Sequence, residues 1–257
     1  MLIRETHCAE EFDNDENETL AKNVISVAAH EGLVTLSQDQ ISFTHDSFAE
    51  AAYSLLEPEE RAPFHLKLGK LLIQHVSKDL FQEHLFTIAV QLARGNPESL
   101  QNEDRISTAR IFLNAGDKSY SASAFPVALS WFSFGISLLQ EQDWLHHRRL
   151  CADIYLKAAD ASSITGDYDD MNSWLAIIFD RCKDSVFDLL TAYYIRVRKL
   201  AAKDEDPKAL DVGLEALRLV NIRFPSRNMM LHIMVSTRIN YMLQLLMDMT
   251  MPYERYT

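Results

Sequence analysis

The chain has 257 residues, a formal net charge of −12 and 47% hydrophobic residues, enough for one large domain or two small ones with a buried core. Its seven glycines and seven prolines amount to about half of the share found in an ordinary chain. So few turn-forming residues argue against a β-sandwich, a barrel or a glycine-loop nucleotide site, and we predict an all-α fold.

The composition also argues against contact with nucleic acid or a membrane. Binding to phosphates needs clustered Lys and Arg, and this chain is acidic. No apolar run reaches the length of about 18 residues that a membrane-spanning helix needs. The three cysteines, Cys8, Cys151 and Cys182, are odd in number and far apart, which is typical of a reduced protein. We therefore expect a cytoplasmic protein.

The first predicted unit is small and follows an acidic segment. Residues 1–18 are rich in carboxylates and are expected to form a disordered lead-in. Residues 19–57 are predicted to form a partial winged helix, in the order helix, β-hairpin, helix, with strands at 33–36 and 41–43. Ser47 and Glu50 have the spacing of a capping box at the start of the second helix. Because Lys22 is the only Lys or Arg of this unit, we expect it to pack against protein and not DNA.

Residues 58–257 are predicted to form an irregular solenoid of helix pairs that resemble tetratricopeptide (TPR) repeats. In such pairs small residues allow the two helices to approach closely, and an aromatic residue lies near the turn. The candidate packing residues are Gly116, Phe125 and Ala128 in a first pair, Ala159, Gly166, Tyr168 and Met171 in a second, and Val197 and Ala209 in a third. The intervals from Ala128 to Met171 (43) and from Met171 to Ala209 (38) exceed a standard repeat of about 34 residues.

A methionine-rich helix is predicted over 226–249. Met230, Met234, Met242 and Met249 are candidates for a partner-binding face, because methionine suits adaptable binding surfaces. The alternatives are a core helix covered by helices that this chain lacks, and a face for self-association. Terminal solenoid helices normally have a polar outer face, so we expect this solenoid to be uncapped at its C-terminal end.

No pattern in the sequence predicts catalysis, a cofactor or a bound metal. The closest two glycines lie 19 residues apart, which excludes a phosphate loop. The adjacent His146 and His147 would point about 100° apart on a helix, so they cannot share a metal ion. We therefore predict no catalytic, cofactor-binding or metal-binding residue.

Several ordered segments carry a family resemblance. FTHDSFAEAAYSLLEPEERAPFHLKLGKLL (43–72) resembles the segment that closes the ATPase module in large multidomain signalling kinases, and the segments 113–139, 155–175 and 209–225 agree with it. Those proteins combine a STAND-type, AAA-like ATPase with a TPR-like helical region, sensor domains and often a histidine kinase. The resemblance implies structural roles, and no catalytic ones, for the matching motif residues His45, Asp46, Ala51, Ala52, Tyr53 and Gly69.

The function that we expect is that of a non-catalytic regulatory module that binds protein. Its partner would be a neighbouring domain of a larger signalling protein, or a peptide in the solenoid groove. One alternative is a stand-alone TPR-like scaffold that binds its partner through the methionine-rich helix, with self-association through 226–249. The other is a truncated chain of an ATP-dependent signalling kinase whose catalytic domains are missing.

Overall fold

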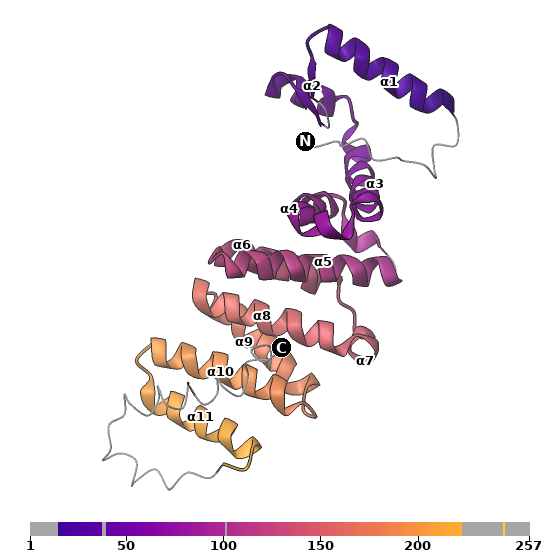
Figure 1. Cartoon of the computed structure of the whole chain (residues 1–257). Helices are drawn as coiled ribbons and strands as arrows, with labels where there is room; N and C mark the ends of the chain where they lie inside the picture. Colours follow the sequence, from indigo (N-terminus) through magenta and orange to yellow (C-terminus); the bar gives the residue numbers. More distant parts are fainter. Residues whose placement is uncertain (1–14, 38–39, 101, 223–243, 245–257) are drawn as a thin grey trace. The chain divides into compact units, whose positions relative to one another are not determined.

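The computed structural model describes residues 15–37, 40–100, 102–222 and 244 (Figure 1). Within them the chain forms eleven α-helices, one short 3₁₀ helix and a single two-stranded hairpin. The predicted all-α class with one small hairpin is confirmed. The described residues divide into two compact units, unit 1 up to Thr108 and unit 2 from Ala109 onward.

Unit 1 holds the predicted helix, hairpin and helix, followed by a long helix pair. Its elements are α1 (Asp15–His30), β1 (Val34–Ser37), β2 (Gln40–Phe43), α2 (Asp46–Ser54), α3 (Pro58–His75), α4 (Lys78–Arg94) and the 3₁₀ helix η1 (Pro97–Ser99). The strands pair antiparallel, with Leu36 opposite Ile41. Helix α1 begins four residues before the predicted start at Thr19. It ends at His30, and the positive φ of 71° at Gly32 permits the sharp turn into β1.

The start of α2 corrects one prediction. His45, and not Ser47, is the N-cap, and its Nδ1 accepts a hydrogen bond from the Ser47 backbone N–H at 3.3 Å. Ser47 lies inside the first turn, with its Oγ 2.9 Å from the same nitrogen. The predicted capping box of Ser47 and Glu50 therefore does not form, because the histidine ring already serves the first turn as acceptor.

The core of unit 1 lies between α3 and α4. Helix α4 buries Leu85, Ile88, Ala89 and Leu92 completely. A Cβ atom at Gly69 would lie 2.8 Å from Cδ2 of Leu92, so glycine is what lets the two helices approach at this point. By contrast, none of the residues 19–37 and 40–57 is buried.

Unit 2 stacks helices in succession (Figure 1). It contains the end of α5 (Asn102–Ser121), then α6 (Phe125–Leu138), α7 (Asp143–His146), α8 (Arg148–Thr165), α9 (Tyr168–Arg181), α10 (Val186–Ala202) and α11 (Asp206–Leu219). Helix α8 packs against α6, α9 and α10, and α10 packs against α9 and α11. Such packing of each pair on the next is that of a solenoid.

The same type of turn joins the two helices of each pair in unit 2. Ser123, Gly166 and Asp204 all have positive φ, and each turn has the backbone hydrogen bond of a Schellman motif. These bonds run from Ala124 N to Ser119 O, from Asp167 N to Ser162 O and from Glu205 N to Leu200 O. The turn residues are separated by 43 and 38 positions. These intervals equal the two that the sequence predicts, so the irregular period is a property of the backbone.

Candidate protein-binding surfaces

The family motif at the start of α2 lies on an exposed surface. Four of its residues are exposed: His45, Asp46, Ala51 and Ala52. His45 is the N-cap of α2. The His45 ring lies edge-on to Phe48 at 6.4 Å between ring centroids. These contacts hold the first turn of α2 in place.

Tyr53 connects the motif to the following helix pair. Its hydroxyl lies 3.0 Å from Nε2 of His65, and Nδ1 of the same ring lies 2.6 Å from Oε1 of Gln91. The guanidinium of Arg61 lies over the Tyr53 ring at 5.0 Å. Because His65 is buried, this chain of hydrogen bonds ties α2, α3 and α4 together and satisfies both ring nitrogens.

The first predicted packing pair meets around a phenylalanine. The nearest atoms to a Cβ built at Gly116 all belong to the ring of Phe132, which is fully buried beside Ala128. Phe125 begins α6 and places its ring edge-on to Tyr120 at 5.1 Å. Gly116 of α5 therefore packs against the ring of Phe132 of α6, a residue that the sequence prediction did not include.

The second and third predicted pairs lie in two successive cores. Ala159 and Met171 are fully buried in the core between α8 and α9, and Tyr168 packs against it. Val197 and Ala209 are fully buried in the next core, between α10 and α11. Gly166 supplies the left-handed turn of the second pair at φ 93°. The four methionines proposed as a partner face, Met230, Met234, Met242 and Met249, lie outside the described residues.

A ladder of polar contacts joins the first helices of successive pairs, and the sequence prediction did not include it. Lys157 of α8 pairs with Asp117 of α5. Asp160, one turn further along α8, accepts from the Tyr120 hydroxyl and pairs with Arg198 of α10. Burial and the Asp160 carboxylate raise the pKa of Tyr120 well above its ordinary value. The partners in these three contacts lie 40, 40 and 38 positions apart. Polar side chains that can pair at about that interval are therefore the feature of the sequence that points to the ladder.

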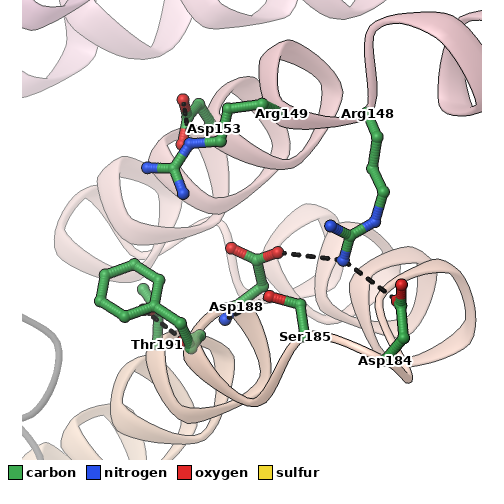
Figure 2. A network of polar contacts seen from close by, with 8 residues as sticks. Arg148, Arg149, Asp153, Asp184, Ser185, Asp188 and Thr191 are labelled. Atoms are coloured by element: carbon green, nitrogen blue, oxygen red, sulfur yellow. Dashed lines mark hydrogen bonds and ion pairs between the residues drawn. The ribbon is translucent and has the colours of Figure 1, made fainter.

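The ladder continues at the other end of α8, as Figure 2 shows. Nη2 of Arg148 lies 3.2 Å from Asp188 Oδ2 of α10 and 3.2 Å from Asp184 Oδ1. The Asp188 side chain is 3% exposed and the Asp184 side chain is 78% exposed. Burial raises the pKa of the neighbouring Cys182 thiol, and the Asp188 carboxylate adds to this effect. Arg148 thus fastens α10 and the preceding turn to α8.

A second surface that the fold leaves uncovered is apolar and lies in unit 1. Leu20, Val24 and Val27 form an apolar stripe on α1, and each is about 60% exposed. Leu36 of β1 and Leu55, after α2, are 54% and 82% exposed. Large apolar side chains that are this exposed are candidates for contact with the surface of another protein.

The described residues include no cluster of three or more His, Cys, Asp or Glu side chains that could hold a metal ion. None of the helices within those same residues combines the length and the apolar character that crossing a membrane requires.

Comparison with known proteins relates the chain to a signalling kinase. No family model matches it, and no solved structure matches it. It is similar to the hybrid signal transduction histidine kinase G of Dictyostelium discoideum, with 22% identity over 201 residues. The aligned region covers 68% of this chain and 6% of that protein, so the chain spans a small part of its relative's length.

Proposed function

We propose that this chain is a non-catalytic regulatory module that binds protein and that belongs between the ATPase and the sensor and kinase parts of a cytoplasmic signalling protein. The observation that carries the proposal is the similarity to a short region of a hybrid histidine kinase. The order helix, hairpin, helix, followed by stacked helix pairs, supports the partial winged helix and the TPR-like pairs that the sequence pattern predicts.

Two structural features support a mechanical role for such a module. The uncovered stripe of α1 in unit 1 would be covered by a neighbouring domain, since none of the described residues of 19–57 is buried. The Schellman turns fix the two helices of each pair, and the polar ladder joins each pair of unit 2 to the next. Partner binding on a fixed stack would favour one arrangement of the attached domains over another.

The non-catalytic part of the proposal is tested by calorimetric titration of the 257-residue chain with Mg–ATP. We expect no saturable heat up to about 1 mM nucleotide, because the chain has no phosphate loop. Saturable binding with micromolar affinity would contradict the proposal and would favour a nucleotide-dependent enzyme.

The place of the module in a larger protein is tested by the reading frame of the natural transcript. We expect a nucleotide-binding loop upstream and a histidine-kinase pattern downstream, in the same frame. A frame that contains neither would instead favour the stand-alone scaffold that binds through its methionine-rich C-terminal helix.

A further inference from the structure

A groove in unit 2 has an apolar floor and a basic rim. It has a volume of about 670 Å³ and lies between α9, α10 and α11. Leu175 and Phe179 of α9, Leu200 of α10 and Val212 of α11 form apolar lining. Arg196, Lys199 and Lys208 supply three cations, against the single carboxylate of Asp211. In a chain with a net charge of −12, this local excess of positive charge stands out.

The rim already holds one carboxylate of the chain itself. Lys208 Nζ lies 2.5 Å from Glu205 Oε2, and the pKa of Glu205 is lowered by Lys208 first and by Lys199 and Lys203 as well. Lys199 and Lys203 share the ring of Tyr168, at 5.4 Å and 3.8 Å from its centroid. Lys199 and Lys203 lie at the C-terminal end of α10, where they complement the negative end of the helix dipole, and Lys208 lies in the first turn of α11.

We propose that this groove binds an acidic, amphipathic peptide segment of a partner protein. The apolar floor would take one or two large side chains, such as Phe or Leu, and the rim would pair with flanking carboxylates. A protein interface usually has apolar side chains at its centre and charged side chains at its edge. The inference deepens the proposed function, on which it rests, by naming the chemistry of the partner and the place where it binds.

The test uses the 257-residue chain and a fluorescein-labelled peptide, Asp-Glu-Phe-Asp-Glu-Leu-Asp-Glu, followed by fluorescence anisotropy. We expect saturable binding that weakens when salt is raised from about 50 to about 300 mM, because surface charges are screened. A peptide with Asn and Gln in place of the acids, and one with Ala in place of Phe and Leu, should each bind at least about tenfold more weakly.

The structure offers a matched pair of variants. Lys208 and Lys183 are equally exposed, at 72% and 73%, and each pairs with an acid three positions earlier, but only Lys208 lines the groove. Lys208→Glu should weaken peptide binding about tenfold, and Arg196→Glu, a second exposed position, should do the same. Lys183→Glu changes the net charge equally and should have less than about a twofold effect.

Three results would overturn the proposal. They are an absence of saturable peptide binding to a folded chain, equal loss of affinity in Lys183→Glu and Lys208→Glu, and equal competition by a short oligodeoxythymidine, which would make the rim a general polyanion site. None of these results bears on the reading frame or on Mg–ATP binding. Failure of the groove is therefore distinguishable from failure of the proposed function.

Discussion

At Gly116 a Cβ atom would lie 2.2 Å from Cε1 of Phe132, whose side chain is fully buried. The ring cannot move away without disturbing the core that it shares with Ala128 and Ala158. Gly116→Ala should therefore lower the free energy of unfolding by about 1–3 kcal/mol, as overpacking does. Thermal unfolding followed by circular dichroism measures this change.

Gly135 is the matched control, because it too lies inside a helix of unit 2. Its added Cβ would lie 3.3 Å from Cδ1 of Ile154, the movable end of a side chain. Gly135→Ala should be neutral or stabilising by up to about 1 kcal/mol, since Ala favours the helix. Equal losses in the two variants would mean that the contact with Phe132 is not what makes Gly116 necessary.

The raised pKa of Tyr193 predicts how the free energy of unfolding depends on pH. Burial, followed by its hydrogen bond with Glu215, raises the pKa of Tyr193 from its ordinary value of 10.0 to about 12. The stability that this tyrosine contributes is fully present below about pH 10 and is lost as the pH rises towards 12. Tyr193→Phe should therefore lose less stability than the wild type between about pH 10 and 12.

Two measurements check the assignment of Tyr193. The absorbance of ionised tyrosine should show a late-titrating component near pH 12 in the folded wild type, and this component should be smaller in Tyr193→Phe. The difference in thermal midpoint between the two proteins should be largest at neutral pH and should shrink as the pH rises from about 10 to about 12. A component of equal size in both proteins would contradict the assignment.

At the scale of the elements, the contacts of Arg148 hold α10 against α8. Asp188 and Asp184 both lie 3.2 Å from Nη2 of Arg148, but only Asp188 is buried. Asp188→Ala leaves a partly buried guanidinium without its inner partner and should lower the free energy of unfolding by about 3 kcal/mol. Asp184→Ala removes an exposed partner and should lower it by less than about 1 kcal/mol.

Urea unfolding of the two aspartate variants measures this difference directly. Both variants replace an aspartate partner of Arg148 with alanine, so the two differ in the burial of the residue removed and not in its type. If Asp184→Ala were as destabilising as Asp188→Ala, the buried pair would not be what joins α8 to α10.

The helix pairs could be predicted from the sequence because their turns are local. The turn at Gly166 and the fully buried Ala159 and Met171 depend on residues close together in the chain. The hairpin was likewise predictable from its short β-rich runs. The capping box predicted for Ser47 and Glu50 was wrong, because the His45 ring accepts from the first turn in place of the serine hydroxyl.

The polar ladder was not predicted, because each of its charged members, taken alone, resembles a solvent-exposed residue on a helix. Asp117, Lys157 and Asp160 acquire partners only when helices 40 residues apart lie side by side. The groove between α9, α10 and α11 is hidden from sequence reasoning for the same reason. The division between the units is not visible in the sequence either, because it falls within the continuous helix α5.

For the whole molecule, the central claim is that these residues serve inside a larger signalling protein and act by binding protein. The most direct measurement is a denaturing immunoblot of cells that make the protein, with an antibody raised against residues 109–222, followed by peptide mapping of the band. The account predicts a polypeptide far larger than 29.4 kDa that also yields peptides of an ATPase and a histidine kinase. A single band at 29.4 kDa, with peptides from this chain alone, would contradict it.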